Sequence, residues 1–150
     1  MIFSTLIFAG ALAADSPSPL PTPQSLPAIT VRAPKAVLHV QVARNEEQRE
    51  RGLMSVTHLP AHTGMLFIFE GDSPVAFWMK DTLLPLDMIF IAQDGTVRKI
   101  YANVAVVPPA MPDADIPRES GTAKYVIELP ANEAAADGIA PGIRLPSLPK

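Results

Sequence analysis

The segment Leu86-Asp87-Met88-Ile89-Phe90-Ile91-Ala92-Gln93-Asp94-Gly95-Thr96 decides the fold class of this chain. It begins with an apolar run of the β type that contains a single carboxylate. The dipeptide Asp94-Gly95 then gives a strong hairpin signal, because a type I′ turn needs a positive φ at both central positions. Residues 86–92 and 96–101 are therefore predicted to be paired antiparallel strands.

Further strands are predicted on both sides of this hairpin. Residues 36–43 alternate between apolar and polar side chains, which is typical of a half-buried strand. Other runs that indicate strands lie at 65–69, 75–79 and 123–129, with a turn at 70–74 and a final edge strand at 143–145.

Two short helices are predicted between these strands. Asn45 and Gln48 form a capping-box pattern at the start of a helix over residues 46–51, which Gly52 ends. Asn132 is predicted to cap a single helical turn. Strands outnumber helices about three to one, so the expected class is mainly β (α+β): a small antiparallel, partly closed barrel or sandwich with one or two short helices.

The prolines divide the chain. There are 17 in 150 residues, and six of them precede Lys35. Because Pro cannot donate to a β-ladder, residues 15–35 are predicted to be a disordered Pro-rich tether. The folded domain is expected at 36–146 and a tail at 147–150. Four more prolines lie within 107–118, where they predict an irregular loop at the rim of a site.

The first residues and the composition indicate a compartment. Residues 1–14 are predicted to be a signal peptide, because an apolar run ends in the small-x-small pattern Ala11-Leu12-Ala13. This run is shorter than the ~20 residues of a membrane-spanning helix, so we expect a periplasmic or secreted protein without a transmembrane span. The chain has no cysteine, which excludes disulfides, thiol nucleophiles and Cys-ligated zinc. A formal net charge of −3 argues against a nucleic-acid partner.

Five motifs in a fixed order resemble the domain-of-unknown-function family 192, whose members are small bacterial and archaeal proteins. They are Arg49-Glu50-Arg51-Gly52-Leu53-Met54, Gly64-Met65-Leu66-Phe67-Ile68-Phe69, Phe77-Trp78-Met79-Lys80-Asp81-Thr82, Pro85-Leu86-Asp87-Met88-Ile89-Phe90 and Tyr125-Val126-Ile127-Glu128-Leu129. The resemblance covers 37–142 and implies a β-rich domain, often behind a signal peptide, with no established activity. Where this chain has Asp81, Asn132 and Ile143, the family usually has Asn, Gly and an acidic residue.

A ligand site is predicted from Arg49, Trp78, Lys80 and Asp87. An ionised Asp87 within an apolar run costs several kcal/mol unless it is paired. It either accepts backbone N–H bonds or an ion pair from Arg49 and stabilises the fold, or it anchors a ligand at the base of a pocket. Trp78 and Lys80 are two residues apart and would share a strand face, although Trp78 is equally well explained as a core residue.

The leading hypothesis is therefore an exported module that binds a small molecule or a protein, with no cofactor and no resident metal. One alternative is a hydrolase or lyase that uses Asp87 and Glu128, unless Glu128 faces solvent; no catalytic residue is assigned. The other is a periplasmic copper binder, since thioether and imidazole ligands suit copper. Its ligands would come from Met54, Met65, Met79, Met88, Met111, His39, His58 and His62.

Overall fold

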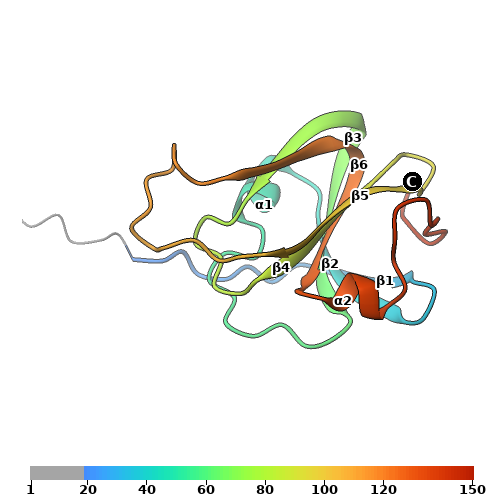
Figure 1. The fold of residues 1–150 in the computed structure, drawn as a ribbon, viewed down its shortest axis with the longest axis horizontal. Coiled ribbons are helices and arrows are strands. Elements are labelled where there is room, and N and C mark those ends of the chain that lie inside the picture. Colours follow the sequence, from blue (N-terminus) through green and yellow to red (C-terminus); the bar gives the residue numbers. More distant parts are fainter. Residues whose placement is uncertain (1–18) are drawn as a thin grey trace, which may run out of the picture.

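The computed structural model describes residues 19–150, so the predicted signal peptide lies outside the described residues. Six strands form one mixed sheet in the order β1-β2-β3-β6-β4-β5, and the sheet does not close (Figure 1). The elements are β1 (Ala28–Arg32), β2 (Val37–Ala43), α1 (Glu46–Arg51), β3 (Thr63–Trp78), β4 (Leu86–Ile91), β5 (Val97–Val104), β6 (Arg118–Pro130) and α2 (Glu133–Ala136). The mainly-β class with two short helices is confirmed. In the described part of the chain, no helix is long and apolar enough to cross a membrane.

One strand pair differs from the expected antiparallel arrangement. Strands β2 and β3 are parallel, whereas the other four pairs are antiparallel. Parallel neighbours need a long crossover connection, usually with a helix. Residues 44–62, which include α1, make that crossover, so the helix that the sequence predicts also returns the chain to the same end of the sheet.

Strand β1 lies inside the segment expected to be a tether. Residues 28–32 pair with β2, and Val31 is fully buried. Pro27 and Pro34 flank this stretch instead of interrupting it, so every residue of the strand retains its N–H group. The sheet therefore begins at Ala28 rather than at Ala36.

Strand β3 is longer than predicted. The two runs expected on either side of a turn at 70–74 form a single strand of 16 residues. Its pairing with β6 shifts register between Ile68 and Ser73, so the expected turn is an irregularity within the ladder. Such irregularities bend a strand. The half of β3 before the shift is mostly buried, and the half after it is partly exposed.

The β4–β5 hairpin is confirmed, but its turn is of a different type. Of the two turn residues, only Gly95 has a positive φ, at 88°. Ala92 N–H donates to the Thr96 carbonyl, and Thr96 N–H donates to the Asp94 side chain. This closes a three-residue loop with glycine in the left-handed position. A type I′ turn is not formed.

The central strands are buried on both faces. Successive residues of β3, β4 and β6 point into two different apolar clusters. One cluster contains Leu66, Ile89 and Ile127, and the other contains Phe67, Phe90 and Val126. A polar side chain on either face of these strands is therefore removed from water unless a groove reaches it.

Asp87 is one such side chain, and it stabilises the fold. It is 1% exposed and accepts three backbone N–H bonds, from Asn103 at 2.8 Å, Asn132 at 3.1 Å and Ala134 at 2.9 Å. One carboxylate on β4 thus joins β5 to the start of α2. Asn132, predicted to cap α2, makes no side-chain cap and has a left-handed φ of 71°. The N–H groups at the start of α2 donate instead to Asp87, which lies 45 residues before Asn132 in the sequence.

We expect Asp87→Asn to lower the free energy of unfolding by about 3 kcal/mol, because the amide leaves buried N–H groups without acceptors. Urea unfolding monitored by circular dichroism measures the change. Asp115→Asn, in an exposed loop position, is the control and should alter stability little. A loss below about 1 kcal/mol for Asp87→Asn would contradict the assigned structural role.

Candidate functional site

Helix α1 forms one wall of the candidate site, and its start is fixed locally. Gln48 N–H donates to the Asn45 side chain at 2.9 Å, while the Gln48 side chain accepts from Asn45 N–H at 3.3 Å. This is the predicted capping box. Gly52 ends the helix with a φ of 46°, a backbone conformation that favours glycine.

A groove of about 380 Å³ lies between α1 and the second half of β3. This volume is that of a small-molecule site. Aromatic, aliphatic, cationic and acidic side chains form the wall, with Glu46 and Glu50 from α1 among them, and a buried carboxyl from β6 reaches the lining. The lining includes Arg49, Phe69, Phe77, Trp78, Lys80 and Glu128.

The groove brings together three of the four predicted site residues. Arg49, Trp78 and Lys80 all line it, whereas Asp87 does not. Of the two roles predicted for Asp87, the structure shows the structural one, because its carboxylate accepts N–H bonds from β5 and α2 and does not face the groove. The carboxyl group at the groove belongs to Glu128.

Arg49 links α1 to β3 at the edge of the groove. Its Nη1 atom donates to the Arg44 carbonyl at 2.6 Å and to the Ile68 carbonyl at 3.1 Å. Its guanidinium carbon lies 5.1 Å from the centre of the Phe69 ring, within the range of a cation–π contact. These contacts orient a positive charge at the groove and replace the predicted alternative of an Arg49–Asp87 ion pair.

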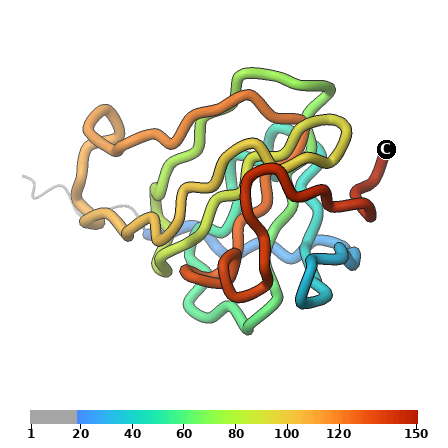
Figure 2. Tube along the Cα trace, turned by 45° about the vertical axis from the view of Figure 1, so that its right-hand side comes forward, coloured from blue at the N-terminus to red at the C-terminus, as the bar shows by residue number. Residues whose placement is uncertain are grey.

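Trp78 and Lys80 connect the groove to the Pro-rich loop. Lys80 Nζ lies 5.1 Å from the Trp78 ring centre and 2.5 Å from an Asp113 carboxylate oxygen. Asp113 belongs to the segment between β5 and β6, which Figure 2 shows reaching away from the sheet before the chain returns. This ion pair attaches the loop to the edge of the groove, the position expected of a rim.

Glu128 has the most perturbed environment of these groups. It is 4% exposed, and burial raises the pKa of its carboxyl from 4.5 to about 8. None of residues 19–150 pairs with it through a hydrogen bond or an ion pair. The carboxyl is therefore mostly protonated at pH 7 and can donate a hydrogen bond into the groove.

The alternation of β6 placed Glu128 opposite Tyr125, Ile127 and Leu129, which suggested a solvent-facing side chain. The alternation itself is right, because these three residues belong to the other cluster. The opposite face is nevertheless a second core. The sequence does contain a signal for this burial, namely the apolar run around Met65. Met65 lies directly opposite Glu128 on β3, so an apolar run there indicates that the face carrying Glu128 is also covered.

The methionines considered as copper ligands mostly fill the core. Met65, Met79 and Met88 are at most 2% exposed and belong to one apolar cluster. Met65 Sδ lies 3.8 Å from Gln24 Nε2, which is its polar contact. Filling irregular core space is the ordinary role of methionine. His39 and His58, in contrast, are exposed.

Taken together, the fold and the site define a small β-rich domain with a groove on one face of an open sheet and a neutral carboxyl group at that groove. The chain belongs to DUF192, a family described as "Uncharacterized ACR", whose sequence profile matches residues 28–147. The family resemblance is thereby confirmed. The match includes β1, in agreement with a domain that starts before residue 36.

Two solved structures are similar to this chain. A Sinorhizobium meliloti protein, described as a candidate transcription regulator, shares 39% identity with a TM-score of 0.69. The match covers 83% of this chain and 96% of that one. A Novosphingobium aromaticivorans protein of unknown function shares 28% identity with a TM-score of 0.71, over 86% of this chain and 94% of its own. No curated protein matches the chain significantly.

We expect Glu128→Gln to remove a pH dependence from the stability of the domain. The Glu128 carboxyl has a pKa of about 8 when folded and about 4.5 when unfolded. The unfolded chain therefore releases a proton that the folded chain retains, and stability falls as the pH rises from about 4.5 to about 8. At pH 8 the variant should be more stable than the wild type by a few kcal/mol, because Gln carries no charge to desolvate.

Urea unfolding at pH 5, 6.5 and 8 measures this difference. Glu70→Gln makes the same chemical change at an exposed position outside the groove, and it should follow the wild type at each pH. Parallel pH profiles for Glu128→Gln and the wild type would contradict the burial of a neutral carboxyl.

Proposed function

We propose that this chain is an exported binding module that takes a small polar molecule in the α1–β3 groove. The observation that carries the proposal is the Glu128 carboxyl, buried at an open groove with a pKa of about 8. A perturbed titratable group in a cleft is a common mark of a functional site. In its neutral form it offers a donor that an ionised carboxylate lacks.

The lining supports a specific class of ligand. Phe69, Phe77 and Trp78 offer aromatic surface, while Arg49 and Lys80 supply positive charge at the edge. These groups suit a molecule with one apolar face and an oxygen acceptor, such as a carbonyl or carboxylate. Aromatic surface would hold the apolar face, and the Glu128 hydroxyl or the cations would bind the oxygen.

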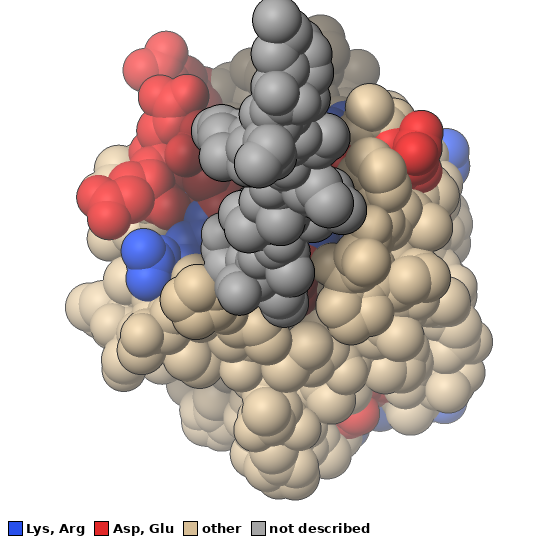
Figure 3. Space-filling view, turned by 90° about the vertical axis from the view of Figure 1, so that its left-hand side faces the viewer, with Lys and Arg blue, Asp and Glu red and all other residues tan. Residues whose placement is uncertain are grey.

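The surface and the sequence support the other parts of the proposal. In Figure 3 the described part of one face is mostly uncharged, with the largest group of Asp and Glu side chains at its upper left edge. This distribution favours a small molecule or a protein over a nucleic acid as partner. Export rests on the apolar run of residues 2–13, which ends in the small-x-small pattern Ala11-Leu12-Ala13. Fractionation of cells that express the native gene tests it, and cytoplasmic recovery alone would contradict it.

A second candidate, a hydrolase or lyase, rests on the same carboxyl. A general acid works best when its pKa lies near the working pH, and burial brings Glu128 into that range. Asp87 is no longer a candidate for acid or base catalysis, because its carboxylate accepts three backbone N–H bonds. Turnover of the bound molecule separates the two functions, because a binding module leaves its ligand unchanged and an enzyme converts it. If the chain is such an enzyme, Glu128→Gln should stop the conversion.

We expect a thermal-shift screen of small carboxylic acids, amino acids and sugars to identify a ligand. At 100 times its dissociation constant a ligand adds about 2.7 kcal/mol of stability, which raises the melting temperature by several degrees. Glu128→Gln and Trp78→Phe should reduce the shift, whereas Glu70→Gln should preserve it. A shift that survives both groove substitutions would place binding elsewhere, and a flat screen would contradict a small-molecule ligand of these classes.

A further inference from the structure

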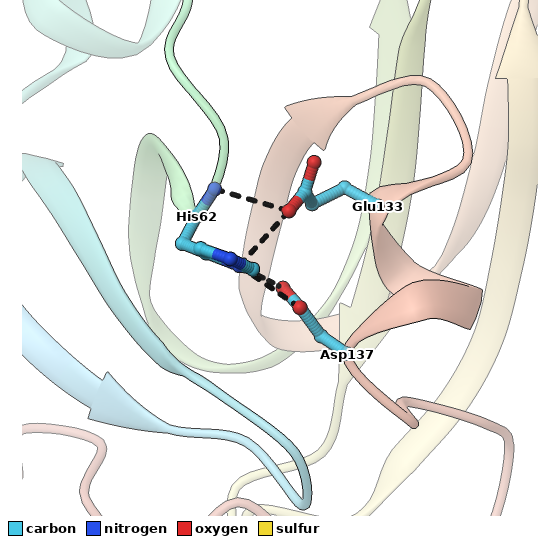
Figure 4. Close-up of side chains that lie close together, drawn as sticks. All are labelled: His62, Glu133 and Asp137. Carbon is cyan, nitrogen blue, oxygen red and sulfur yellow. Dashed lines mark hydrogen bonds and ion pairs between the residues drawn. The ribbon is translucent and has the colours of Figure 1, made fainter.

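A second polar cluster lies where the residue before β3 faces α2. Figure 4 shows His62 pointing between the carboxylates of Glu133 and Asp137. The His62 Nδ1 atom is 2.9 Å from Glu133 Oε1, 2.9 Å from Asp137 Oδ1 and 3.1 Å from Asp137 Oδ2. The two carboxylates belong to the face of the sheet opposite the groove, because α2 packs into the other apolar cluster through Ala134.

The His62 ring has fewer protons to donate at Nδ1 than there are carboxylate oxygens around it. A histidine Nδ1 atom carries at most one proton, and a single N–H makes one well-aligned bond. Three carboxylate oxygens nevertheless converge on it, and in the described part of the chain only Glu133 Oε1 among them has a second donor, the His62 backbone N–H at 3.1 Å. The Asp137 side chain is only 2% exposed, and among residues 19–150 it has no partner other than His62. A buried carboxylate needs a compensating positive charge. A protonated His62 supplies one such charge, and a metal ion bound at this point to the neutral imidazole would contact both carboxylates at once.

The fold positions the three groups, and one hydrogen bond within the cluster contributes: His62 N–H donates to Glu133 Oε1 at 3.1 Å. Glu133 and Asp137 are four residues apart, so they project from the same side of the α2 turn. The Asp87 carboxylate fixes α2 through Ala134 N–H, and Lys35 N–H donates to the Asp137 carbonyl at 3.0 Å. The donor atoms are therefore arranged by the fold, which lowers the cost of binding an ion.

We propose that His62, Glu133 and Asp137 bind a divalent transition metal ion of the zinc type. Their ligand atoms lie within 4.8 Å of one another, close enough for a single ion to contact all three. One imidazole nitrogen and two carboxylate oxygens form a ligand set that Zn²⁺ accepts, and three protein ligands leave a further position for water. The half-exposed His62 side chain gives access from solvent.

This site is separate from the proposed function. None of its three residues lines the α1–β3 groove. It also differs from the copper hypothesis, which used thioether sulfur as well as imidazole, because here carboxylate oxygens predominate. An imidazole with two carboxylates disfavours Mg²⁺ and Ca²⁺, which prefer oxygen ligands throughout. Zn²⁺ is therefore the appropriate probe and Mg²⁺ the comparison.

Isothermal titration of the tag-free chain with Zn²⁺ tests the proposal. We expect one equivalent to bind, Mg²⁺ to bind far more weakly, and His62→Ala to weaken Zn²⁺ binding by at least about tenfold. His58→Ala removes an exposed histidine from the same connection, outside the cluster, and should leave binding unchanged. Substitution with Co²⁺ should give the visible absorption of a protein-bound ion, which His62→Ala abolishes.

Glu133→Gln provides a second variant in case His62→Ala fails to fold, which thermal unfolding establishes. It too should weaken Zn²⁺ binding while the groove remains intact, so thermal shifts by groove ligands persist. Equal Zn²⁺ affinity of the wild type and both folded variants, or no Zn²⁺ binding by the wild type at millimolar metal, would overturn the proposal. In that event the three residues form only a hydrogen-bonded cluster.

Discussion

Strand β6 is hydrogen-bonded to β3 on one side and to β4 on the other, and this central position constrains the rest of the molecule. Apolar clusters cover both of its faces, so every side chain from Tyr125 to Leu129 is removed from bulk water. Four of these five residues are hydrophobic. The fifth, Glu128, meets solvent only where the groove opens between α1 and β3. The chemical character of the groove follows from that placement.

The molecule uses two buried carboxyl groups in different ways. Asp87 lies on β4 and receives three backbone N–H bonds, so its charge is compensated and its contribution is structural. Glu128 lies one strand away and has no donor among residues 19–150, so its neutral form is favoured. Burial alone does not distinguish a structural carboxyl from a functional one; the surrounding hydrogen-bond donors do.

Local patterns in the sequence predicted the local structure well. The capping box of α1 and the β4–β5 hairpin both depend on residues close together in sequence. What failed depended on distant partners: the parallel β2–β3 pair, the pairing of β1, and the burial of Glu128 under a second cluster. Asn132 shows the same limit, since Asp87, 45 residues earlier, contacts the start of α2.

The proposed binding function depends most on a neutral Glu128 at the groove, and a titration of its carboxyl carbon by ¹³C NMR measures that state directly. Comparison with Glu128→Gln, which lacks the signal, assigns the resonance. The structure predicts a midpoint near pH 8, because the side chain is desolvated and unpaired among the described residues. A midpoint near pH 4.5, the ordinary value for a glutamate, would show that the carboxyl is hydrated or paired and would contradict the assignment of this groove as the functional site.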